Sequence, residues 1–214
     1  MPIAHKLKET MSSPGAAVIR KMFEEGIILK KKYGEDKVFD FSLGNPDLEP
    51  PEEVFAAIRA VAAESVPHKH GYMPNAGYDF ARAAMAQKTQ QEQGVPVDAS
   101  CIVMSVGAAA ALNCVFKAVL NPGDTVLVPA PFFAEYRHYA ANQNATLVEV
   151  PTGEDFSLDV QAVRAALTEK TAAVLINSPN NPCGKVYAQV ELNALAAVLA
   201  EHGRRCGRMP YLIC

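Results

Sequence analysis

From residue 100 onward the sequence alternates short apolar runs with stretches of helical length. The clearest apolar run, residues 172–176, contains only nonpolar side chains, as expected of a strand that is buried on both faces. A strand with one face in water would alternate polar and nonpolar residues instead. Strands and helices that alternate in this way form a mostly parallel sheet with helices on both faces. The sequence therefore predicts an α/β fold.

The same patterns assign the individual elements. Strands are predicted at residues 101–105, 125–129, 145–150, 172–177 and 211–214. Helices between them are predicted at residues 108–120, 132–141, 159–167 and 189–202. An N-terminal helical segment precedes this region. Helices are predicted at residues 16–32 and 76–93, and a third begins at Pro50-Pro51 and has an apolar face that is expected to point inward. A short strand is predicted at residues 38–42.

Composition narrows the classes of function. Half of the residues are hydrophobic and 20% are charged, which is typical of a folded globular protein. The formal charge of −3 indicates no basic surface for nucleic acid. No apolar run approaches the roughly 18 residues that a membrane-spanning helix needs. We therefore expect no nucleic-acid partner, no membrane partner and a cytoplasmic location.

The five cysteines are odd in number and widely spaced, and no two form a C-x-x-C pair. Disulfide frameworks and zinc sites show paired spacings that are absent here. We therefore expect no metal site, and we expect Cys101 and Cys114 to be small core residues because both lie in apolar segments.

Ligands of open α/β sheets bind at the carboxyl ends of the strands. Three segments that follow predicted strands contain residues suited to binding a ligand. In the first, residues 105–110, the backbone amides of Gly107, Ala108 and Ala109 begin a helix and are suited to a phosphate. In the second, residues 129–136, two prolines stiffen a turn that presents aromatic rings, on which a flat cofactor stacks. Either segment, taken alone, is also compatible with an ordinary turn or core packing.

The third segment, residues 177–185, is the most specific. Its two prolines and three asparagines form a rigid loop with outward amides, and such an amide can donate to a phenolate oxygen of a bound ring. A fourth segment, residues 71–77, contains Tyr72, whose hydroxyl can reach a phosphate.

In this order and spacing, the segments resemble the class I/II aminotransferases, which are fold-type I enzymes dependent on pyridoxal phosphate. The resemblance runs from about residue 19 to residue 214. Residues 177–184 resemble the family's Asn-Pro-Thr/Ser-Gly signature, and residues 44–47 resemble its Gly-x-Pro-Asp/Glu loop. The implied fold is an incomplete large aminotransferase domain at residues 46–214. Residues 1–45 would form an N-terminal arm and part of the small domain.

The resemblance also implies roles for single residues. Asn181 would hydrogen-bond the ring hydroxyl oxygen of the cofactor, and Phe133 would stack on its ring. The phosphate would be bound by Gly107, Ala108 and Ala109, and by Tyr72 acting on the neighbouring subunit of a homodimer, while Gly44 would line the substrate pocket. Two departures from the family pattern stand out: Cys183 replaces the usual Ser or Thr, and Ala108 and Ala109 offer no hydroxyl groups.

The implied activity moves an amino group between an amino acid and a 2-keto acid. The family's Schiff-base lysine, pyridine-binding aspartate and substrate-binding arginine correspond to positions after Cys214. This chain alone is therefore expected to be inactive, with Lys185 as a surface residue and not a substitute amine. Three alternatives remain open at this point: a carbon–sulfur lyase of the same fold, a non-catalytic interaction half-domain, and an unrelated phosphate-binding α/β module.

Overall fold

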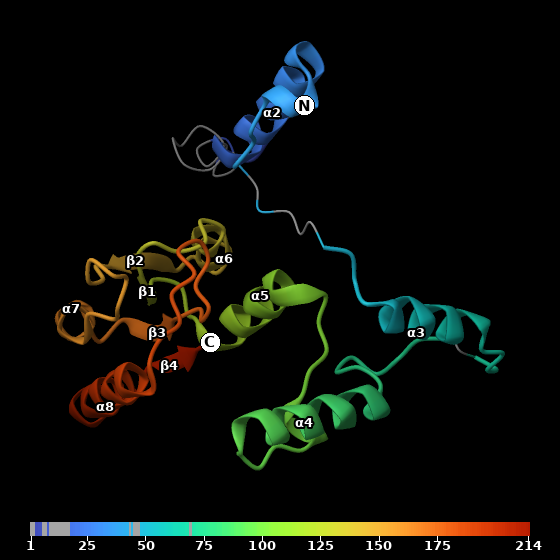
Figure 1. Cartoon of the computed structure of the whole chain (residues 1–214). Helices are drawn as coiled ribbons and strands as arrows, with labels where there is room; N and C mark the ends of the chain where they lie inside the picture. Colours follow the sequence, from blue (N-terminus) through green and yellow to red (C-terminus); the bar gives the residue numbers. More distant parts are fainter. Residues whose placement is uncertain (1–2, 6–7, 9–17, 43, 45–47, 69) are drawn as a thin grey trace. The chain divides into compact units, whose positions relative to one another are not determined.

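The computed structural model describes residues 3–5, 8, 18–42, 44, 48–68 and 70–214 (Figure 1). The chain forms two compact units, Met1–Met104 and Ser105–Cys214, and each is described by itself. Among the described residues, no helix is both long enough and apolar enough to cross a membrane.

The first unit is helical. Its elements are α2 (Val18–Tyr33), η1 (Glu35–Lys37), α3 (Glu52–Ala63), α4 (Asp79–Gln93) and η2 (Ala99–Cys101). Helix α3 begins after Pro51 with two glutamates in its first turn, where the helix dipole favours negative charge. Helix α4 ends at Gly94, which adopts the left-handed conformation that glycine permits. The three predicted helices are thereby confirmed, although residues 16 and 17 lie outside the described part of the chain.

Several predictions for this unit are wrong. Residues 38–42 and 101–105 form no strand, because neither segment joins a ladder of backbone hydrogen bonds with another strand among the described residues. The apolar face of α3 is not inward, since Val54, Phe55, Ile58 and Val61 are 36% to 60% exposed. A helical period shows that one face is apolar but does not show what covers it.

Arg82 fastens α4 to the segment that follows it. Its guanidinium donates to the carbonyl oxygens of Ile102 at 2.9 Å and of Ala99 at 2.6 Å. The backbone N–H of Met104 donates to the carbonyl of Ala76 at 2.9 Å. These hydrogen bonds hold residues 99–104 against α4 and against the turn that precedes it, without forming a sheet.

The second unit contains the sheet (Figure 1). Its strands are β1 (Thr125–Pro129), β2 (Thr146–Val150), β3 (Thr171–Leu175) and β4 (Tyr211–Ile213), all parallel, in the order β2-β1-β3-β4. Its helices are α5 (Gly107–Val119), α6 (Tyr136–Ala141), α7 (Val160–Ala166) and α8 (Gln189–Cys206). The four strands predicted in this unit after residue 120 are confirmed, each to within two residues at either end.

Two apolar clusters cover the two faces of this sheet. Leu127 of β1 and Val174 of β3 pack in one cluster with side chains from α7 and α8, including Val163 and Leu195. The flanking strand residues, such as Val126, face the other way, into a cluster with side chains of α5 and α6 that include Phe116 and Tyr136. Burial of each fully buried aliphatic side chain of this kind contributes roughly 1.5–3 kcal/mol to the free energy of folding. The predicted α/β fold, with a parallel sheet and helices on both faces, is confirmed.

Cys101 and Cys114 are exposed, so the prediction that they are core residues is wrong. Cys114 lies on α5, but the buried face of that helix is carried by Phe116, together with the partly buried Leu112 and Val119. An apolar neighbourhood in sequence therefore did not identify the buried face of the helix.

Candidate functional site

The strand order creates a switch point between β1 and β3. After β1 the chain moves outward to β2 on one side, and it then returns to β3 on the other side of β1. The loops that leave β1 and β3 therefore diverge, and open α/β sheets bind ligands in the crevice at such a point. The loop after β1 contains residues 130–135 and the loop after β3 contains residues 176–188. These are the second and third segments selected from the sequence.

The loop after β1 presents the aromatic rings of Phe132 and Phe133. The N–H of Ala130 donates to Val150 at 2.9 Å and its carbonyl accepts from the hydroxyl of Thr152 at 2.7 Å, which fixes the loop to the end of β2. The Phe133 ring meets the buried Tyr136 ring edge to face, with centroids 5.6 Å apart, and remains partly exposed. The helix predicted from residue 132 in fact begins at Tyr136, because residues 132–135 form this loop.

The loop after β3 is held by its own polar groups. The side-chain oxygen of Asn177 accepts from the N–H of Asn181 at 2.9 Å, and Gly184 donates to the carbonyl of Asn180 at 2.7 Å. The Ser178 hydroxyl accepts from the N–H of Tyr187 at 3.1 Å. Gly184 has a φ of +72°, a conformation that favours glycine at this turn. Hydrogen bonds within the loop therefore fix its conformation, and its rigidity stays a prediction.

The three asparagines of this loop do not all point outward, contrary to the prediction. Asn180 is 7% exposed, and its side-chain nitrogen donates to the carbonyl of Pro131 at 2.8 Å and to the sulfur of Cys183 at 3.0 Å. Asn181 is exposed, and its side chain makes no hydrogen bond to any described residue. The structure thus brings the loop of Asn181 against the loop of Phe133 and leaves the Asn181 amide available.

Sequence reasoning missed Asn180 as a residue that organises the site. Neighbouring asparagines in a loop have no periodic pattern that separates an inward from an outward side chain. The partner of Asn180, the carbonyl of Pro131, lies 49 positions away along the chain, so the local sequence carries no signal that marks Asn180 as the inward side chain.

The first turn of α5 offers backbone donors. Gly107, Ala108 and Ala109 are exposed, Gly107 has a φ of +73°, and no side chain caps the helix. The first N–H groups of a helix have no partner within the helix, and the dipole adds positive charge there. This turn therefore has the donors that a phosphate needs, and it lacks side-chain hydroxyls, as expected from Ala108 and Ala109.

Tyr72 and Gly44 lie in the first unit. Tyr72 is fully exposed and its ring is available to an external group. Gly44 is exposed, and a side chain placed there meets no atom within 4 Å. The other residues of its predicted loop, 45–47, lie outside the described residues.

Lys185 is held in an ion pair next to the candidate site. Its ammonium donates to a carboxylate oxygen of Asp155 at 2.7 Å. This hydrogen bond raises the pKa of Lys185 above its ordinary value, and the same bond, with help from Ser157, holds the pKa of Asp155 far below its ordinary value. A lysine with a raised pKa is protonated and is a poor nucleophile.

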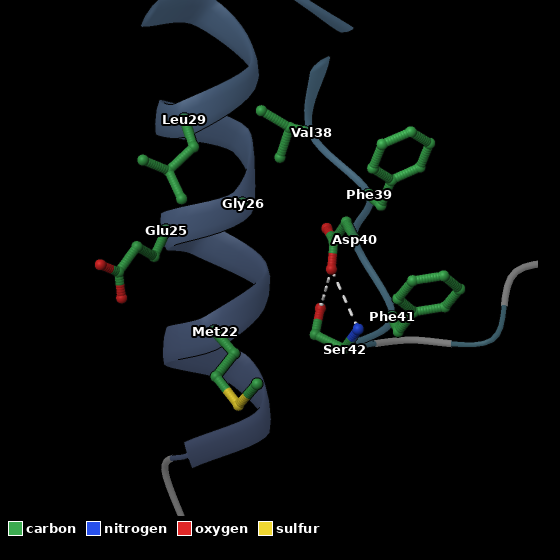
Figure 2. A pocket seen from close by; sticks show the side chains of 9 residues that line it. All are labelled: Met22, Glu25, Gly26, Leu29, Val38, Phe39, Asp40, Phe41 and Ser42. Atoms are coloured by element: carbon green, nitrogen blue, oxygen red, sulfur yellow. Dashed lines mark hydrogen bonds between the residues drawn. The ribbon is translucent and has the colours of Figure 1, made fainter. Parts of the chain in front are cut away.

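A separate hollow of about 360 Å³ lies between α2 and residues 38–42 (Figure 2). Figure 2 shows Val38 and Asp40 directed toward α2, and Phe39 and Phe41 directed away from it. Asp40 accepts from the N–H of Ser42 at 3.0 Å and from its hydroxyl at 2.6 Å, and these bonds lower the pKa of Asp40. The walls are otherwise almost entirely apolar, so the hollow lacks the convergent polar groups of a ligand site.

Comparisons with known proteins agree with this geometry. Residues 36–206 match the family described as aminotransferase class I and II. A probable aspartate/prephenate aminotransferase of Thermus aquaticus is 37% identical over 202 residues, which cover 94% of this chain and 50% of the relative. The chain therefore spans about half the length of this curated relative.

Solved structures give the same result. An aminotransferase of Eubacterium rectale is 33% identical, with a TM-score of 0.90 over 100% of this chain and 54% of that one. An aspartate aminotransferase of Thermus thermophilus, solved with maleate, is 32% identical, with a TM-score of 0.82 over 99% of this chain and 52% of that one.

Proposed function

Because the chain belongs to the class I and II aminotransferase family, we propose that it supplies the cofactor-binding part of a pyridoxal-phosphate-dependent aminotransferase. The activity is the transfer of an amino group between an amino acid and a 2-keto acid. The observation that carries the proposal is the free amide of Asn181, which stands on a rigid loop joined to the loop of Phe133 at the switch point of the sheet.

The residues present fit this cofactor. Asn181 donates to the hydroxyl oxygen of the ring, and Phe133 packs on the ring face. The uncapped first turn of α5, with the amides of Gly107, Ala108 and Ala109, binds the phosphate. Bound pyridoxal phosphate supplies the electron sink for the reaction, and these residues fix where its ring lies.

We propose a dicarboxylic amino acid, such as aspartate, as the donor substrate. The Thermus aquaticus relative is named as an aspartate/prephenate aminotransferase, and maleate, with which the Thermus thermophilus enzyme was solved, is a dicarboxylate. Gly44 lines the pocket for this substrate in the proposal. These relatives are aminotransferases, so their names do not favour the carbon–sulfur lyase alternative.

The proposal includes a homodimer located in the cytoplasm. Tyr72 belongs to this part of the proposal, because its exposed hydroxyl contacts the phosphate of the cofactor bound to the partner subunit. Residues 1–45 form an arm and part of a small domain, and residues 46–214 belong to the large domain. In this proposal none of the described lysines takes the Schiff-base role, so the chain by itself binds the cofactor without transaminating.

Calorimetric titration with pyridoxamine phosphate tests the proposal. This form of the cofactor has no aldehyde and cannot react with surface lysines, so it reports only noncovalent contacts. We expect saturable binding with one site per chain, and Asn181→Ala should weaken it about tenfold, the typical loss for one hydrogen bond to a polar ligand. The matched control is Asn142→Ala, which removes an amide that bridges α6 to Asn113 and lies outside the proposed contacts. An absence of binding, or equal affinity in Asn181→Ala, would refute the proposal and favour a non-catalytic interaction role.

A further inference from the structure

Two loops of the proposed site are joined by one hydrogen bond. The side-chain nitrogen of Asn180 donates to the carbonyl of Pro131 at 2.8 Å, across 49 positions of sequence. Residues 130–133 and 177–184 are all described, and no other hydrogen bond connects these two segments. Beyond the pairing of β1 with β3, the Asn180 amide therefore supplies the hydrogen bond that fixes the two loops to each other.

Asn180 is also fixed on its own side. Its backbone N–H donates to the carbonyl of Lys185 at 2.9 Å, its carbonyl accepts from the N–H of Gly184 at 2.7 Å, and the residue is 7% exposed. The second donor of its side-chain amide points to the sulfur of Cys183 at 3.0 Å. An amide that is buried and whose nitrogen donates both to its own loop and to the neighbouring loop has little freedom to move, so it couples the positions of the two loops.

We infer that Asn180 is a positioning residue: it fixes the amide of Asn181 and the ring of Phe133 in one arrangement that matches a flat, hydroxyl-bearing ring. The inference rests on the proposed function, because both contacts belong to the proposed cofactor site. A ring stacked on Phe133 carries its hydroxyl in the ring plane, and the Asn181 amide has to reach that oxygen at hydrogen-bond distance. A displacement of about 1 Å between the loops is enough to lose such a contact.

The role follows from position along the chain as well as from contacts. Asn180 immediately precedes Asn181, and Pro131 lies two residues before Phe133. The hydrogen bond therefore joins the two loops close to the residues that contact the ring. Asn180 touches neither cofactor nor substrate in the proposal, which distinguishes a positioning residue from a binding residue.

The first test compares the wild-type chain, Asn180→Ala and the control Asn142→Ala by two measurements. In the absence of ligand, the backbone amide resonances of Phe132 and Phe133 should shift in Asn180→Ala and stay unchanged in the control. The affinity for pyridoxamine phosphate should fall about tenfold in Asn180→Ala and stay unchanged in the control. A purely local structural role would shift resonances in residues 177–185 alone and leave the affinity intact, which would overturn the inference.

A double-mutant cycle sharpens the test. If Asn180 acts through the loop of Phe133, its substitution should cost much less affinity in a Phe133→Leu background than in the wild type. Additive losses would contradict the inference. Cys183→Ser retains a hydrogen-bonding side chain of similar size, so it should preserve the resonances of Phe132 and Phe133.

One measurement requires no variant, in case Asn180→Ala does not fold. In the wild-type chain, the side-chain protons of Asn180 should exchange with solvent much more slowly than those of Asn181, and equally fast exchange overturns the inference. Slow exchange at Asn180 without binding of pyridoxamine phosphate instead overturns the proposed function, and the role toward the cofactor falls with it. The two failures are therefore distinguishable.

Discussion

Arg208 forms a two-pronged ion pair with Asp124, although the two residues are 84 positions apart. One guanidinium nitrogen lies 3.0 Å from one carboxylate oxygen, and a second lies 2.8 Å from the other. Asp124 is 7% exposed, directly precedes β1 and also accepts from the backbone N–H of Asn121 at 2.9 Å. Arg208 lies just before β4. The pair therefore ties the entry of the edge strand β4 to the entry of the central strand β1.

Removal of the guanidinium should destabilise the second unit. In Arg208→Met the carboxylate of Asp124 stays largely buried without its partner, and we expect a loss of about 1–3 kcal/mol in the free energy of unfolding. The lower part of the range applies because the Arg208 side chain is 40% exposed, so water already screens part of the interaction. Urea unfolding followed by circular dichroism measures the loss. Arg137→Met, which removes a more exposed ion pair with Glu149, is the control and should cost less than about 1 kcal/mol.

The same pair predicts an acid-dependent loss of stability. The hydrogen bond from Arg208 lowers the pKa of Asp124 from 3.8 to about 2. A group whose pKa is lower in the folded state stabilises the fold above its ordinary pKa, and this stabilisation disappears as the pH falls through the folded pKa. The difference in unfolding free energy between the wild type and Asp124→Asn should therefore be constant above pH 3.8 and decrease from there to about pH 2. A difference that does not change over this range would contradict the assignment.

Gly77 should tolerate alanine worse than Gly94 does. Both residues have positive φ angles, +102° for Gly77 and +66° for Gly94, so alanine is strained at either position. A side chain at Gly77 would also approach the Met104 side chain to 2.6 Å, whereas a side chain at Gly94 meets no atom within 4 Å. We expect Gly94→Ala to cost about 1 kcal/mol and Gly77→Ala at least twice as much. Hydrogen exchange of the α4 amides reports both effects, and equal exchange rates in the two variants would refute the steric argument.

The sheet was predictable from the sequence, whereas the contacts between its loops were not. Runs such as residues 172–176 are apolar without alternation, and burial on both faces is the common physical reason for such a run. Residues 38–42 have strand-like composition as well, yet strand formation requires a hydrogen-bonded neighbour, and local sequence does not show whether one is present.

The candidate site was predictable only in outline. The loops after β1 and β3 were identified by their prolines, aromatics and asparagines, because such residues after a strand mark the ligand edge of an α/β sheet. The inward direction of Asn180 depends on the carbonyl of Pro131, a partner 49 residues away. Long-range partners of this kind follow from the assembled sheet and have no local signature.

The ion pair of Lys185 with Asp155 predicts how the chain reacts with an aldehyde. Because Asp155 raises the pKa of Lys185, the unprotonated amine that attacks a carbonyl is scarce at neutral pH. Treatment with pyridoxal phosphate followed by borohydride should give adducts spread over several lysines, with Lys185 among the least modified. In Asp155→Asn the pKa of Lys185 returns toward its ordinary value, and the adduct at Lys185 should increase several-fold, as measured by peptide mass spectrometry. A single stoichiometric adduct at Lys185 in the wild-type chain would show that its amine is free to react, and it would make Lys185 a candidate for the Schiff-base role that the proposal leaves unassigned.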